Sequence, residues 1–324
     1  MSNTTENNVK SSEIVIMAER DMAKVSAKQK AMQILVKIAL YAFLLTMAVI
    51  VLFPFYWMII SSVKSLEEYN LAVPTFFPHE IHFENYIEGF KTAQLGQLFI
   101  NTVYVGVVST VLSLVITVLS AFAFARLEFK GKNALFAGLL ATMMIPGELF
   151  TITNYQTVND FLGLNTLGKE LGSDFLKSLG NWQNTYTVLI IPFLVSVFYI
   201  YLLKQNFMQI PNELYLAAKV DGTKDIKYLW KVMIPLALPT IISITILKMM
   251  GAWNSYVWPR LVANDDAHKL ITNGLRGADF TVDSMIHYPR QMAAVAIVSL
   301  PLFLVFLFLR KYIMKGVSRS GIKG

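Results

Sequence analysis

The stretch ELYLAAKVDGTKDIKYLWKVMIPLALP, residues 213–239, separates two runs that are apolar enough to lie in lipid. Unlike its neighbours, it carries lysines, acidic residues and a central Asp-Gly pair. It is too long for a tight turn, and its pattern is too regular for a disordered linker. The sequence therefore predicts a structured, basic connector at a membrane surface, between two membrane spans.

Two helices are expected in this connector. Pro211 suits the first turn of a helix, where its missing N–H costs nothing, and Glu213 faces the positive end of the helix dipole. The first helix should stop at Asp221 and Gly222, because glycine tolerates the left-handed conformation that ends helices.

A second helix is predicted after this turn. Thr223 can cap it. Ile226, Trp230 and Met233 would then share one face at helical spacing, and Pro235 would open the next span. On these residues alone, the pair of helices either rests on lipid headgroups or receives another surface.

The composition indicates a membrane protein. Of the 324 residues, 55% are hydrophobic and only 15% are charged, whereas a soluble domain usually has about 25% charged residues. The mean hydropathy is +0.52. The chain has no cysteine, which excludes a disulfide framework and a thiolate metal site. The pI near 9.3 is better explained by basic residues at the cytoplasmic face than by nucleic-acid binding.

The apolar runs lack the alternation of a membrane barrel, so the predicted fold class is all-α, a polytopic membrane protein with six spans. The third predicted span is interrupted at Pro146, Gly147 and Glu148. The six predicted spans are residues 34–62, 98–125, 133–153, 185–203, 234–258 and 291–311.

Lysines and arginines set the predicted orientation. Most of them lie before the first span and after the second, fourth and sixth. Both termini and the connector are therefore expected in the cytoplasm, with residues 1–33 as a tail rather than a signal peptide. Residues 34–315 would form the transmembrane domain and residues 316–324 a basic tail.

All four histidines fall in predicted outer loops: His79, His82, His268 and His287. An ordinary loop is favoured over a metal site for His79 and His82, so no metal site is predicted.

At this point the connector carries a resemblance to a known family. AAKVDG, nine residues and then VMIP resemble the EAA signature of binding-protein-dependent ABC importer permeases: E-A-A, three residues, G, nine residues, I-x-L-P. Ala217, Ala218 and Gly222 match it. Leu216 stands in place of the signature's glutamate, and Glu213 lies about one turn earlier.

The resemblance covers the chain from about residue 38 to its end. AFARLEFKGKNALFAGLLATMMIPGE, GAWNSYVWP and KGVSRSGIKG are similar to segments of the maltose-type sugar permeases, in particular the smaller six-span partner. It implies a sugar importer subunit that pairs with a second related permease, two ATPase subunits and an extracellular solute-binding protein in the plasma membrane.

The resemblance also implies that the chain is not an enzyme and binds no cofactor. ATP and Mg²⁺ would be bound by the ATPases, and the sequence has no G-x-x-x-x-G-K-[ST] loop.

The connector would dock on an ATPase subunit, and Asp221 either caps the turn or contacts that subunit. The residues expected to take part in coupling are Glu213, Ala217, Ala218, Asp221, Gly222, Lys224 and Pro235.

Aromatic faces combined with amide and hydroxyl groups suit a sugar path. Trp253, Asn254 and Tyr256 in the fifth span supply them, whereas Trp258 also fits an interfacial aromatic belt. Asn154 and Tyr155 follow the break in the third span, and such breaks often line cavities.

Two charges lie within the predicted spans, Lys248 and Glu148. Intramembrane charges are costly and usually face the bundle or a water path. They either pair with each other, extend toward the interface, or, for Lys248, bind an acidic sugar such as a uronate.

In the resembling family, the loop after the fifth span probes the binding protein. Residues 260–288 form that loop here, and the contact residues expected in it are Asn264, Asp265, Asp266 and Phe280.

Other functions fit less well. A membrane enzyme would need paired carboxylates, metal-spaced histidines or a nucleophile arrangement, and the spans show none. A secondary transporter working alone would favour an internal inverted repeat and more buried ion ligands. An acidic saccharide or a glycerol-phosphate-type solute stays open as the substrate of the same transporter class.

Overall fold

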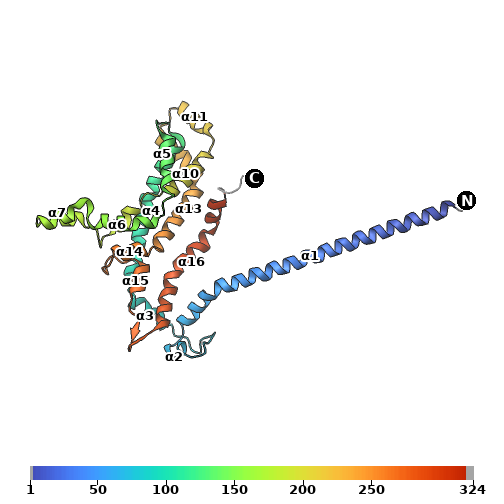
Figure 1. The fold of residues 1–324 in the computed structure, drawn as a ribbon, viewed down its shortest axis with the longest axis horizontal. Helices are drawn as coiled ribbons and strands as arrows, with labels where there is room; N and C mark the ends of the chain where they lie inside the picture. The colour runs from blue at the N-terminus through green and yellow to red at the C-terminus, as the bar shows by residue number, and fades with distance from the viewer. Residues whose placement is uncertain (1–2, 319–324) are drawn as a thin grey trace. The chain divides into compact units, whose positions relative to one another are not determined.

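The computed structural model describes the backbone of residues 3–318 and the side chains of residue 29 and residues 32–310 (Figure 1). Its regular structure is helical apart from a two-stranded antiparallel hairpin, in which Thr281 pairs with Ile286. Contacts divide the chain into two units, residues 1–60 and residues 61–324. The basic tail predicted at 316–324 lies outside the described residues from residue 319 onward.

The first unit consists of helix α1 (Asn3–Ser62), whose last residues belong to the second unit. The segment Met32–Ser62 is long and apolar enough to cross a membrane. Most of its apolar side chains are exposed, as expected of a surface that meets lipid. The first predicted span is therefore confirmed as a helix.

Helices long and apolar enough to cross a membrane also occur in the second unit. Three of them are continuous in the described residues: α4 (Leu95–Arg126), Asp225–Trp253 and, within α16 (Tyr288–Ser318), Tyr288–Arg310. Two bent pairs of helices also pass this test, so the described residues hold four candidate spans, or up to six if each bent pair counts as one. This confirms the all-α, polytopic fold class.

The first bent pair confirms the interruption predicted in the third span. Helix α5 (Lys132–Thr142) ends before Pro146, and the chain continues at an angle of 78°. The segments after the bend are η1 (Gly147–Leu149), α6 (Phe150–Asn159), η2 (Phe161–Gly163) and α7 (Leu164–Glu170).

The second bent pair corrects the fourth span, which was predicted as unbroken over residues 185–203. Helices α9 (Tyr186–Ile190) and η3 (Ile191–Phe193) meet α10 (Val197–Met208) at 46°. Pro192 lacks the N–H that a continuous helix needs. Ser196 then caps α10, and its Oγ accepts a hydrogen bond from the backbone N–H of Tyr199 at 3.5 Å.

Short elements lie between these spans. They are α2 (Leu66–Tyr69), α3 (Glu84–Thr92), α8 (Asp174–Gly180), α14 (Val257–Val262), α15 (Ile271–Gly277), β1 (Thr281–Val282) and β2 (Met285–Ile286).

The connector contains the two predicted helices. Helix α11 (Asn212–Val220) begins after Pro211 and has Glu213 in its first turn. It ends where the sequence predicts, because Gly222 has φ +69°, in the left-handed region. Helix α12 (Asp225–Tyr228) follows, then a π-helical turn, η4 (Leu229–Met233), and α13 (Ile234–Trp253), with Pro235 in its first turn.

Two details of the second connector helix were predicted wrongly. The residue at its N-cap is Lys224, not Thr223. Ile226 and Trp230 are exposed, whereas Met233 is fully buried, so the three do not share a face. The π-helical turn explains this difference, because its wider winding rotates Met233 away from the face on which the two earlier side chains lie.

Apolar packing joins the connector to the spans of the second unit. One core cluster combines Leu203 and Phe207 of α10 with Tyr228, Leu229 and Met233. Small residues permit close contact elsewhere, as at α3 and α16, where a Cβ added to Gly89 would lie 2.6 Å from the carbonyl oxygen of Arg290.

Replacing Gly89 with alanine should therefore destabilise the protein. The added Cβ meets backbone atoms that cannot turn aside, so we expect the free energy of unfolding to fall by about 1–3 kcal/mol. Gly138 in α5 is the matched control: a Cβ there meets nothing within 4 Å, and Gly138→Ala should raise helix stability by about 0.5–1 kcal/mol. Thermal unfolding in detergent checks both, and equal shifts would contradict the close packing.

Candidate functional site

The exposed surface of the connector includes large apolar side chains. Leu216, Val220 and Trp230 are 55%, 89% and 65% exposed. Ala217 is also exposed, and Ala218 is half-buried. A surface of this kind, in which small side chains lie between larger apolar ones, can enter a groove on another protein or rest on lipid.

Polar contacts hold the two connector helices together across their turn. The Tyr215 hydroxyl donates to Oδ1 of Asp225 at 2.8 Å, and Nζ of Lys219 lies 2.8 Å from the same oxygen. The ring centroids of Tyr215 and Tyr228 are 5.1 Å apart. The hydrogen bond with Asp225, and then that with Tyr215, raises the pKa of Lys219 above its ordinary value. The connector is therefore braced internally.

Of the residues predicted to take part in coupling, several lie on the outer surface of this braced turn. Glu213, Ala217, Asp221, Gly222 and Lys224 are exposed. The sequence interpretation did not nominate Tyr215 or Asp225, although opposite charges on either side of an Asp-Gly turn were a usable signal.

Arg126, at the end of α4, links the connector to the second span. Its Nη2 donates to the carbonyl oxygens of Phe207 at 2.9 Å and of Ile210 at 2.5 Å. Its Nη1 lies 3.5 Å from Oδ1 of Asn212, at the start of α11. The side chain is buried, with 9% exposed. Sequence reasoning counted Arg126 only as a cytoplasmic charge and missed this role.

A cavity of about 430 Å³ lies among α4, α13, α14 and the bend between η3 and α10. Lys248 lines it, and Nζ of Lys248 donates to the carbonyl oxygen of Phe193 at 2.5 Å. Trp258 also lines it, is 6% exposed, and donates from Nε1 to the carbonyl oxygen of Val188 at 2.9 Å. Trp258 is thus a cavity wall rather than part of an exposed belt.

The other residues proposed for the sugar path in the fifth span lie elsewhere. Trp253 is buried in a core cluster, with its ring centroid 5.6 Å from that of Phe99. Asn254 is exposed, and its Nδ2 donates to the carbonyl oxygen of Met250 at 3.0 Å. Tyr256 lies under the guanidinium of Arg276.

The residues beyond the break in the third span are also outside this cavity. Glu148 is exposed and Asn154 is half-buried. The Tyr155 hydroxyl accepts a hydrogen bond from Nε2 of Gln183 at 3.2 Å. Of the seven predicted path residues, Lys248 alone lines the cavity found within the described part of the chain.

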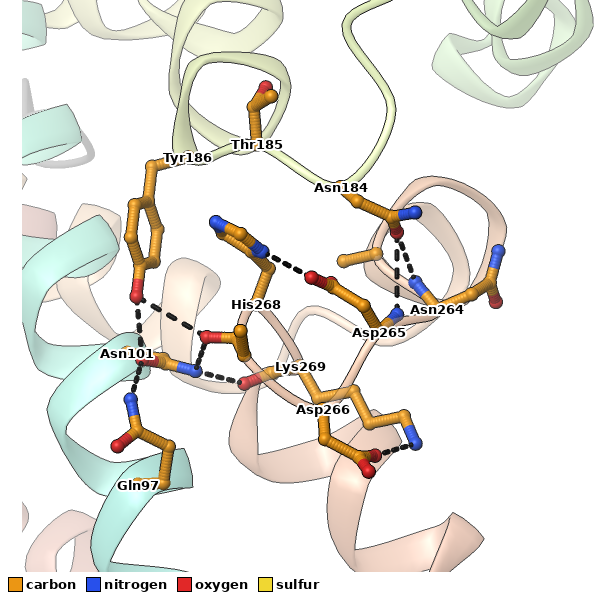
Figure 2. A network of polar contacts seen from close by, with 12 residues as sticks. Gln97, Asn101, Asn184, Thr185, Tyr186, Asn264, Asp265, Asp266, His268 and Lys269 are labelled. Carbon is orange, nitrogen blue, oxygen red and sulfur yellow. Dashed lines mark hydrogen bonds and ion pairs between the residues drawn. The ribbon is translucent and has the colours of Figure 1, made fainter.

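A polar network fixes the outer loop after α14 (Figure 2). Asn101 of α4 is fully buried, and its Nδ2 donates to the carbonyl oxygens of Ala267 at 2.8 Å and Lys269 at 2.9 Å. Its Oδ1 accepts from the Tyr186 hydroxyl and from Gln97, each at 2.8 Å.

The same loop is held from a second side by Asn184. Its Oδ1 accepts from the backbone N–H groups of Asn264 at 2.8 Å and Asp265 at 3.4 Å. The ring of His268 contacts Oδ2 of Asp265 through Nδ1 at 2.7 Å. The side chains of Asn264 and Asp266 are left exposed, whereas Phe280 is buried. The loop thus presents polar side chains from a fixed backbone.

The other histidine pair contacts carboxylates. His82 lies 2.6 Å from Glu84, and His79 lies 3.7 Å from Glu68. Within the described residues, no group of three or more potential metal ligands occurs.

Known proteins are similar in sequence to this chain. The diacetylchitobiose uptake system permease protein NgcG of Streptomyces coelicolor is 28% identical over 281 residues, which cover 86% of this chain and 87% of NgcG. The arabinooligosaccharides transport system permease protein AraQ of Bacillus subtilis is 26% identical over 294 residues, 89% of this chain and 96% of AraQ.

A solved structure confirms the fold. It is a chain of a bacterial ABC transporter involved in the import of the acidic polysaccharide alginate, with a TM-score of 0.69 and 22% identity. The match covers 85% of this chain and 95% of that one.

Residues 15–319 match one family throughout. The chain belongs to the family of binding-protein-dependent transport system inner membrane components.

Proposed function

We propose that this chain is the permease subunit of an ATP-driven importer that carries an oligosaccharide across the plasma membrane by alternating access. The observation that carries the proposal is the braced connector between the fourth and fifth spans, which bears the signature of Ala217, Ala218 and Gly222. Two relatives, NgcG and AraQ, are named for oligosaccharide uptake systems, which supports a sugar of this size class.

The proposed assembly contains a second related permease, two ATPase subunits and an extracellular solute-binding protein. ATP and Mg²⁺ bind to the ATPases, and this chain performs no catalysis. The distribution of lysines and arginines supports cytoplasmic positions for both termini and for the connector.

Coupling follows from the rigidity of the connector. ATP favours the closed arrangement of the ATPases, and only its difference in affinity between the two states can drive the change. The connector moves with the ATPase on which it docks. Because Arg126 ties the start of α11 to α4 and to the end of α10, that motion reaches several spans together.

The proposal extends to the sugar path and to the contact with the binding protein. The cavity beside Lys248 is the proposed substrate contact of this chain, with Trp258 as an aromatic wall. Asn264, Asp265 and Asp266 are the proposed contacts for the binding protein, because their loop is held rigidly by Asn101 and Asn184.

Copurification tests the proposed function directly. The chain, expressed together with its neighbouring genes and solubilised in detergent, should retain a second permease and an ATPase. ATP hydrolysis should rise several-fold when the binding protein and its sugar are added. A chain that purifies alone and transports solute into vesicles without ATP would instead be a secondary transporter, and the proposal would fail.

A larger side chain at Ala217 tests docking. Ala217→Arg places a long charged group on the exposed face of α11, so we expect the amount of copurified ATPase to fall about tenfold or more. Ala217→Ser keeps a small side chain, so this variant should retain the copurified ATPase. The ratio of ATPase to permease in the purified complex measures the effect. Equal retention by both variants would remove this face from the interface.

A further inference from the structure

The cavity beside Lys248 has a chemical character that the general importer function does not explain. Hydroxyl groups of Ser109, Ser196, Tyr199 and Ser255 belong to residues that line it. Among the described residues around the cavity, Lys248 is the one that carries a charge. A volume of about 430 Å³ falls within the range of small-ligand sites, about 300–1,000 Å³.

Lys248 lies within its span, nearer to the end of α13 than to its start. It follows Ile234, the first residue of α13, by 14 positions and precedes Trp253, the last residue, by five, which corresponds to about 21 Å and about 7.5 Å of helix. A charge within a span is costly and is usually directed to a cavity with a function. Its position at the cavity wall agrees with that rule.

The ammonium group of Lys248 is held by a neutral partner. Its partner is the carbonyl oxygen of Phe193, at the bend that Pro192 introduces into the fourth span. Within the described side chains, no carboxylate forms an ion pair with it. An ammonium has three donors, and one carbonyl accepts from one of them. The remaining donors can bind an anionic group.

The walls of the cavity suit a sugar ring. The ring centroids of Phe193 and Trp258 are 5.7 Å apart with an interplanar angle of 81°. The hydrogen bond from Nε1 of Trp258 to Val188 fixes the indole ring. Aromatic faces can pack against the apolar face of a pyranose while the serine and tyrosine hydroxyls bind its polar edge.

We propose that this cavity binds a saccharide that carries an anionic group. Lys248 contacts this group, which is a carboxylate, as in a uronate. The inference rests on the proposed importer function and narrows its substrate class. A carboxylate gives a charge-assisted hydrogen bond to the ammonium, which is stronger than the one to the neutral carbonyl of Phe193.

The test uses the complete transporter, assembled with its partner subunits in lipid nanodiscs. Binding of trigalacturonate is compared with binding of its fully methyl-esterified form, which has the same sugar rings without the charges. The wild type should bind the acid at least about tenfold more tightly. Lys248→Met should abolish this preference, because binding of the acid falls at least about tenfold more than binding of the ester, whereas Lys248→Arg should retain the preference. Lys37→Met removes an exposed lysine of α1 and should behave as the wild type.

Several results would overturn the inference. One is equal binding of acid and ester by the wild type. Another is an equal loss of acid binding and ester binding in Lys248→Met, which would make Lys248 only a support for the bend at Phe193. If glycerol 3-phosphate binds in a Lys248-dependent way and trigalacturonate does not, the carboxylate assignment is wrong. A transporter that assembles and imports a neutral sugar but does not bind trigalacturonate refutes this inference alone, whereas failure to assemble refutes the proposed function.

Discussion

One buried guanidinium joins the connector to the membrane bundle. The carbonyl oxygen of Phe207, in the last turn of α10, accepts from the backbone N–H of Ile210 at 3.3 Å and from Nη2 of Arg126 at 2.9 Å. The positive charge also suits the negative end of α10. Because a guanidinium is planar and remains charged, it fixes the direction as well as the length of the hydrogen bonds that it donates. The ends of α4 and α10 and the start of α11 are therefore held at one point.

The rest of the connector extends this rigidity to its exposed tip. Tyr215 and Lys219 of α11 meet Asp225 of α12, and the π-helical turn then buries Met233 against α10. A force applied to the tip therefore reaches the fourth and fifth spans without first bending a hinge. The bend at Phe193, with Lys248 against it, lies in the same pair of spans.

Much of this architecture was readable from the sequence, because apolar length and glycine conformation are local properties. The helices of the first, second, fifth and sixth spans, the break near Pro146 and the turn at Gly222 were predicted correctly. The bend in the fourth span was missed because the apolar run of that span continues without interruption. Pro192 was a visible signal for it. Side-chain direction was least predictable: Trp253 and Trp258 are five residues apart, yet the former packs in a core and the latter lines the cavity. That difference depends on where α13 ends, which tertiary packing decides.

The distance between the connector and the turn that follows the second span tests this rigidity most directly. The chain has no cysteine, so spin labels can be attached at Lys130→Cys and Lys227→Cys, both exposed positions. A rigid connector predicts one narrow distance distribution that is the same in the nucleotide-free and ATP-bound transporter, and that broadens when Arg126 is replaced by methionine. A distance that shifts when ATP binds in the unaltered protein would show that the connector moves independently of α4, and would contradict coupling through Arg126.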